Sequence, residues 1–145
     1  MQKALLSLHV LAGIIFVGGS AVAASLFPRY APVAGSAAPE RNIAVAKAFH
    51  RITGVYAVLA LSVPVVGILL ADLQGRMGEI WVTLAMALTF LAGGLLAVFI
   101  HPDQRKALDQ PDDGRLLRRL SMLAGIYNLL WAVVVVLMIV RPGAH

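Results

Sequence analysis

Four long apolar stretches without a single Asp, Glu, Lys or Arg dominate the sequence, at residues 4–26, 52–70, 80–100 and 122–140. A membrane-spanning helix needs about 20 mostly apolar residues. Inside lipid, the backbone polar groups must be satisfied within the segment, which favours helices. The sequence therefore predicts an all-α membrane protein, a four-transmembrane-helix bundle with both termini outside. We expect one domain over residues 1–145, with helices over about 4–26, 44–70, 80–100 and 116–140.

The composition supports a membrane protein and excludes several chemistries. Hydrophobic residues make up 60% of the chain and charged residues 13%, whereas a soluble domain is about half apolar and about a quarter charged. The absence of cysteine excludes disulfides, thiolate zinc sites, iron–sulfur clusters and cysteine nucleophiles. The expected partners are the lipid bilayer and either another membrane protein or a second copy of the chain. No nucleic-acid partner is expected.

The placement of the basic residues predicts the orientation. Nine of the twelve Lys and Arg residues lie in 27–51 and 101–120, and the other three are Lys3, Arg76 and Arg141. Short cytoplasmic loops are rich in Lys and Arg, so both long connections are expected inside a bacterial inner membrane. The first span also has the features of a cleavable signal peptide, with Lys3, an apolar run and the small residues Ala21-Val22-Ala23. We expect it to be retained, because its removal would export all nine basic residues.

Prolines and acidic residues predict where helices begin or bend. Pro39 followed by Glu40 is typical of a helix start, and so is the Pro111-Asp112-Asp113 run. Pro64 lies inside the second span and is expected to kink it.

Small or polar residues recur at helical spacing in each span and predict the faces that meet in the bundle interior. Without a hydrophobic force between helices in lipid, small residues let backbones approach and polar ones hydrogen-bond across. The predicted stripes are His9, Gly13, Phe16, Ser20 and Ala24; His50, Gly54 and Ala57; Thr83, Ala87, Phe90, Gly94, Ala97 and His101; and Ser121, Gly125, Asn128 and Ala132.

Three of the four histidines fall on these predicted interior faces. A neutral histidine is a good ligand for haem iron or a transition metal. His9 is expected roughly 8 Å below the outer surface, whereas His50 and His101 are expected in the inner leaflet, on the order of 20 Å away. His9 is therefore not expected to share one iron with either of the other two.

Two site hypotheses follow. In the inner-site hypothesis, His50 and His101 clamp one haem b, whose propionates meet Arg51, Arg105 and Lys106. In the outer-site hypothesis, His9 binds a haem or a metal alone or with a weak partner, for which Met86, Met138 and His145 are the candidates. Packing and contact with lipid phosphates are the simpler alternatives for all three histidines.

The run Leu8-His9-Val10-Leu11-Ala12-Gly13, followed by Phe16-Val17-Gly18-Gly19, resembles the opening motif of small four-span bacterial membrane proteins. That group includes an uncharacterised family, CopD-type membrane domains and HemJ-type protoporphyrinogen oxidases. Phe27-Pro28-Arg29 and His101-Pro102 add to the resemblance. The HemJ resemblance implies a role linked to haem b for His9, although Phe16 stands where that motif has tryptophan.

The functional prediction is an uncharacterised inner-membrane protein with a haem b-binding, redox role at its inward-facing histidines. An enzyme of this kind would be a haem-dependent membrane oxidoreductase. The alternative is a non-catalytic accessory subunit, or a CopD-like protein that handles a solute or a metal.

Overall fold

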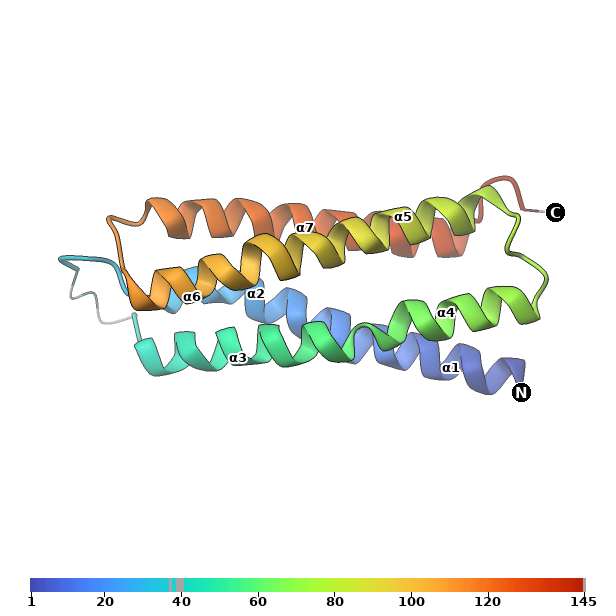
Figure 1. Ribbon diagram of the computed structural model, residues 1–145, viewed down its shortest axis with the longest axis horizontal. Helices are drawn as coiled ribbons and strands as arrows, with labels where there is room; N and C mark the ends of the chain where they lie inside the picture. Colours follow the sequence, from blue (N-terminus) through green and yellow to red (C-terminus); the bar gives the residue numbers. More distant parts are fainter. Residues whose placement is uncertain (37, 39–40, 145) are drawn as a thin grey trace.

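The computed structural model describes residues 1–36, 38 and 41–144, and among these residues there is no strand. Four long helices follow one another along the chain, and two of them contain a wider π-helical turn (Figure 1). The elements are α1 (Gln2–Ala12), η1 (Gly13–Val17) and α2 (Gly18–Tyr30); α3 (Ile43–Leu59) and α4 (Ser62–Leu73); α5 (Ile80–Leu95), η2 (Leu96–Ile100) and α6 (His101–Asp109); and α7 (Arg115–Val140).

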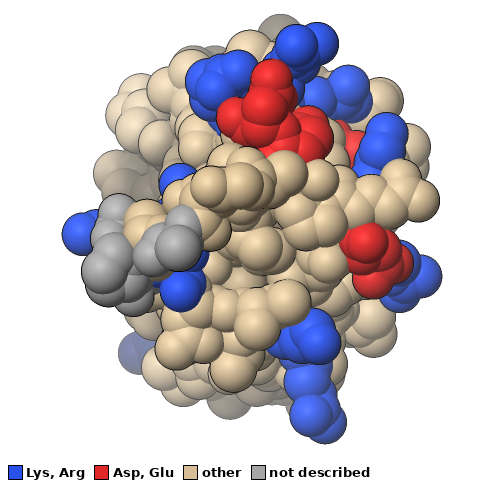
Figure 2. All heavy atoms as spheres, turned by 90° about the vertical axis from the view of Figure 1, so that its left-hand side faces the viewer, with Lys and Arg blue, Asp and Glu red and all other residues tan. Residues whose placement is uncertain are grey.

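The predicted all-α class and the four apolar helices are confirmed. Each long helix is long and apolar enough to cross a membrane, and each extends at least one residue beyond the boundaries expected from the sequence at one or both ends. The chain begins at the end of the molecule where α7 ends and where residues 74–79 connect α4 to α5, here called the terminal end (Figure 1). The opposite end, called the basic end, carries the 31–42 and 110–114 connections. Figure 2 shows Lys and Arg side chains around its rim.

The second long helix breaks as Pro64 predicts. Pro64 has no N–H, so the carbonyl of Ala60 cannot accept the helical hydrogen bond that the residue at position 64 would otherwise donate. The chain turns at Ala60 and Leu61, and the N–H of Val63 donates to the Ala60 carbonyl instead, at 3.1 Å. This break lets α4 change direction relative to α3.

The helix starts follow local capping chemistry. Asp112 accepts hydrogen bonds from the backbone N–H groups of Gly114 and Leu116, so the acidic run does begin α7. The expected start at Pro39 and Glu40 lies outside the described residues. The helix α3 itself begins at Ile43, because the Asn42 side chain accepts from the N–H groups of two residues in its first turn.

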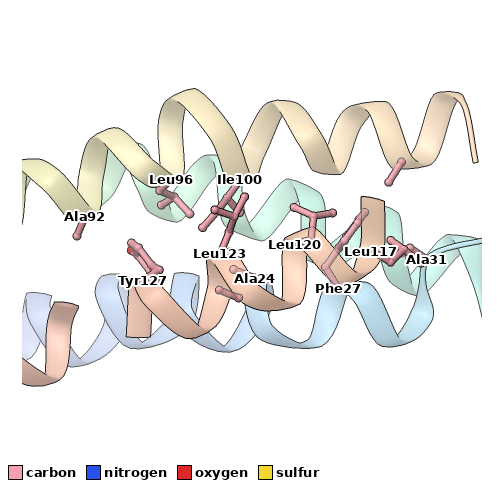
Figure 3. Packing of buried hydrophobic residues seen from close by; sticks show 13 residues of the cluster. Ala24, Phe27, Ala31, Ala92, Leu96, Ile100, Leu117, Leu120, Leu123 and Tyr127 are labelled. Carbon is pink, nitrogen blue, oxygen red and sulfur yellow. The ribbon is translucent and has the colours of Figure 1, made fainter. Parts of the chain in front are cut away.

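The main core fills the basic half of the bundle. There α2 packs against both α3 and α7, and α5 packs against α7. The buried side chains interdigitate between these helices, as Figure 3 shows for Phe27, Leu96, Ile100, Leu120 and Tyr127. Toward the terminal end, α1 packs on α4 while α5 stays with α7, so the bundle divides into two pairs (Figure 1).

The small-residue stripes face the interior in the first long helix but not in the third and fourth. Ser20 and Ala24 are 0% and 2% exposed, as expected. In contrast, the expected stripe residues Thr83, Ala87, Phe90, Gly94 and Ala97, together with Ser121, Gly125, Asn128 and Ala132, are exposed. Asn128 nevertheless donates to the Ser25 hydroxyl of α2 at 2.8 Å, so it does hydrogen-bond between helices as expected of a polar stripe residue. The interior faces of these two helices instead include large side chains, such as Trp81, Leu96, Leu120 and Tyr127. In a membrane protein both the lipid face and the interior are apolar, so small size alone does not separate them.

Candidate functional site

His9 lies on α1 near the terminal end, where α1 packs against α4. Its Nδ1 is 3.0 Å from the backbone carbonyl oxygen of Val63. A carbonyl only accepts, so Nδ1 carries the proton, and Nε2 of the neutral ring keeps its lone pair. Histidines that bind metals usually donate their other N–H to a carbonyl or carboxylate in this way, which fixes the tautomer and the ring orientation.

A glycine on α4 makes room for the His9 ring. A Cβ atom at Gly67 would lie 2.9 Å from Cε1 of His9 and 3.4 Å from its Nδ1. The ring therefore lies against bare backbone, and any larger residue at this position would push it away. After the helix break at residues 60–61, this part of α4 packs against α1.

Two cavities adjoin His9 in the half of the bundle where the helix pairs separate. The larger, about 850 Å³, runs between α1–η1–α2 and α7 and is called the α1–α7 groove. The smaller, about 100 Å³, lies between α1, α4, α5 and α7. His9, Val63, Trp131 and Met138 line both cavities. Small-molecule and cofactor sites typically occupy apolar cavities of about 300–1,000 Å³ with a few polar groups.

The walls of these cavities suit a flat apolar ligand. Gly13, one turn from His9, and Gly18 and Ala21 further along the helix line one side of the groove, so little side-chain volume fills that side. Met86 and Met138 both line the small cavity together with His9, so the two thioethers proposed from depth do lie near it. Trp131 contributes a buried indole N–H that has no hydrogen-bond partner among the described residues.

A second cluster joins His50 on α3 to His101, the first residue of α6. Their rings are stacked, with centroids 4.3 Å apart and an interplanar angle of 19°. A Cβ at Gly54 would lie 2.7 Å from Nε2 of His101, so this glycine provides the space for the stacked ring. The π-helical turn η2 immediately precedes His101 and changes the face on which the residues of α6 lie.

The sequence analysis missed the residue that holds this cluster together. Gln104 is fully buried, and its Oε1 accepts from Nδ1 of His50 at 2.9 Å. Its amide nitrogen donates to the Thr53 hydroxyl at 3.3 Å, and Thr53 in turn donates to the carbonyl of Phe49. The available signal was the spacing, because Thr53 follows His50 by three residues and Gln104 follows His101 by three.

The structure thus brings together two of the three predicted site histidines and leaves His9 in the other half of the bundle. The His50 and His101 rings lie face to face. With ring centroids only 4.3 Å apart, a haem between the two rings would require at least one ring to turn. Binding of one haem b by both His50 and His101 therefore stays a prediction. Arg51, Arg105 and Lys106 are exposed at the basic end, and His145 lies outside the described residues.

Within the described part of the chain, no three His, Cys, Asp or Glu side chains are grouped so that they could hold a metal ion. The described residues therefore offer no site for a metal ion that needs three or more such side chains as ligands. Haem iron is already bound by the porphyrin, so it needs only one or two side chains of the protein as ligands.

Comparisons of this chain with protein-family models, with curated proteins and with solved structures give no match. The resemblance to the HemJ and CopD groups therefore stays a prediction. The function has to be argued from the side chains around the two histidine sites.

Proposed function

We propose that this protein binds haem b through His9 and has a redox role in a membrane. The observation that carries the proposal is the His9–Val63 hydrogen bond, which leaves Nε2 of His9 free to bind iron. The ring lies beside a groove of about 850 Å³ whose walls are almost entirely apolar. A low-polarity pocket with one oriented histidine matches what a haem ligand requires.

Other residues of the same cavities would hold the group. Met86 and Met138 are the candidates for a second, weaker ligand, and Arg141 lines the small cavity at the terminal end, where a propionate would need a cation. The bound haem would supply one-electron oxidation and reduction. The protein would bind and orient it and exclude water with its apolar walls. An enzymatic role would then be that of a haem-dependent membrane oxidoreductase.

The two hypotheses for the ligand give opposite results in one set of variants. His9→Ala is expected to abolish the reduced haem spectrum of the purified protein, and added imidazole is expected to restore part of it. His50→Ala and His101→Ala should leave the spectrum unchanged. If His9→Ala keeps the wild-type spectrum while either of the other variants loses it, the iron is bound at the inner cluster and our assignment is wrong.

We also propose that the protein lies in a bacterial inner membrane with both termini outside. The nine Lys and Arg residues of the two long connections support this orientation. Reporter fusions after Gly35 and after Asp109 should report a cytoplasmic location, and a fusion to the C-terminus should report an external one. A cytoplasmic C-terminus would contradict the charge argument.

A further inference from the structure

A cavity at the basic end of the molecule has a chemistry unlike that of the His9 cavities. It measures about 430 Å³ and lies between the last turns of α2, the 31–42 connection and the first turns of α7. Three arginines line it, Arg29, Arg41 and Arg118, together with the hydroxyl-bearing residues Ser25, Ser36 and Ser121. We call it the arginine pocket.

The fold brings the three arginines together, with Arg41 half-buried and Arg29 and Arg118 exposed. Nη1 of Arg41 donates to the carbonyl oxygens of Pro28 and Ala31, at 3.0 and 2.7 Å, which ties the connection to the end of α2. Arg29 lies in the last turn of α2. Arg118 lies in the first turns of α7, which begins after Gly114 in a left-handed conformation with φ 96°. Three segments of the chain thus bring one cation each to the same cavity.

The carboxylates that the structure describes near this pocket have other partners. The ion pairs among the described residues join Arg76 to Glu79, Arg115 to Asp113, and Arg119 to Asp103. Asp113 also lines the arginine pocket, but its carboxylate pairs with the Arg115 side chain at 3.5 Å and accepts from the Arg115 backbone N–H. Among its described lining residues, the cavity therefore has more positive than negative charge, which favours an anion.

We propose that the arginine pocket binds a phosphate group. The planar guanidinium donates two parallel hydrogen bonds and suits phosphate better than a lysine does. Serine hydroxyls at the rim supply further donors. The pocket lies at the end of the apolar helices, at the level where lipid head groups meet a membrane-spanning bundle, so the phosphate belongs either to a lipid head group or to a soluble phosphate compound.

The test compares a pocket variant with a control of equal charge. Arg29→Gln with Arg118→Gln removes two exposed cations that line the pocket, whereas Arg51→Gln with Arg105→Gln removes two exposed cations at the same end that do not line it. Arg41 is left intact because it supports the backbone. Each protein, purified in neutral detergent at 0.15 M salt, is titrated with short-chain phosphatidylglycerol in one arm and with inorganic phosphate in the other.

The wild-type protein and the control should bind phosphate saturably, with one site per chain. Loss of a hydrogen bond to a charged group lowers affinity at least about tenfold, so the pocket variant should bind at least about tenfold more weakly than the control. Saturation only by the lipid assigns the site to a head group, and saturation by inorganic phosphate assigns it to a soluble compound.

The proposal is overturned if neither ligand saturates the wild-type protein, or if the control loses as much affinity as the pocket variant. The second result would mean diffuse attraction to a basic surface. The pocket shares no lining residue with the two His9 cavities. The result is therefore independent of whether haem binds.

Discussion

Gly67→Ala tests whether the orientation of His9 matters for haem binding. The added Cβ would lie 2.9 Å from Cε1 of His9, and ordinary contact begins at 3.4 Å, so the ring must move by about 0.5 Å (3.4 − 2.9). A shift of this size along the bond lengthens the 3.0 Å hydrogen bond between His9 Nδ1 and the Val63 carbonyl to at most about 3.5 Å, beyond the usual range for N–H···O bonds.

Loss of such a supporting hydrogen bond typically lowers metal affinity about 10- to 100-fold, or by about 1.4–2.7 kcal/mol. We therefore expect Gly67→Ala to bind haem at least about tenfold more weakly, measured by titrating haem into the haem-free protein and following the Soret band. Gly94→Ala is the control, because this exposed glycine has nothing within 4 Å of the added atom. Equal haem affinity in Gly67→Ala and in the wild-type protein would refute the reasoning.

Two further predictions concern buried hydrogen bonds. Gln104→Leu removes the acceptor of the half-buried His50 Nδ1–H and the donor to the Thr53 hydroxyl. It should lower the free energy of unfolding in mixed micelles by about 1–3 kcal/mol, whereas Gln110→Leu, at an exposed position, should change it little. Tyr127 and Ser20 share a buried hydroxyl–hydroxyl bond of 2.8 Å; a double-mutant cycle with Tyr127→Phe and Ser20→Ala should give a coupling energy of about 0.6 kcal/mol, the average for bonds between membrane helices. A coupling energy indistinguishable from zero would mean that this bond adds nothing to the packing of α2 on α7.

The gross architecture follows from the sequence because each of its determinants is local. Uncharged stretches of about 20 residues define the four helices. An even number of spans then returns the chain to the end where it began. The missing N–H of Pro64 accounts for the break before α4, and the side chains of Asn42 and Asp112 cap the helices that follow them.

The faces of the helices and the details of the sites depend on packing, which the sequence pattern does not encode. The stripe that contains Phe90 and Gly94 is exposed although its spacing is helical, because lipid accepts the same residues as a bundle interior. The π-helical turn η2 shifts the register just before His101. No single-residue signal predicts such a turn, so the stacking of His101 on His50 could not be foreseen.

The arginine pocket illustrates the same limit. Counting basic residues predicts which end of the bundle is positive, but not which arginines converge. Arg29 and Arg118 are 89 positions apart (118 − 29) in the sequence, and they meet only because α7 packs beside α2. The hydrogen bonds from Arg41 to the α2 carbonyls likewise depend on the path of the 31–42 connection.

The central claim is that the groove beside His9 holds a haem. The most direct test is the reduced-minus-oxidised absorption spectrum of the wild-type protein, purified from haem-replete cells and paired with an assay of haem per chain. We predict a Soret band that sharpens and shifts on reduction with dithionite, at one haem b per chain. A colourless protein that stays colourless after incubation with haem would contradict the claim.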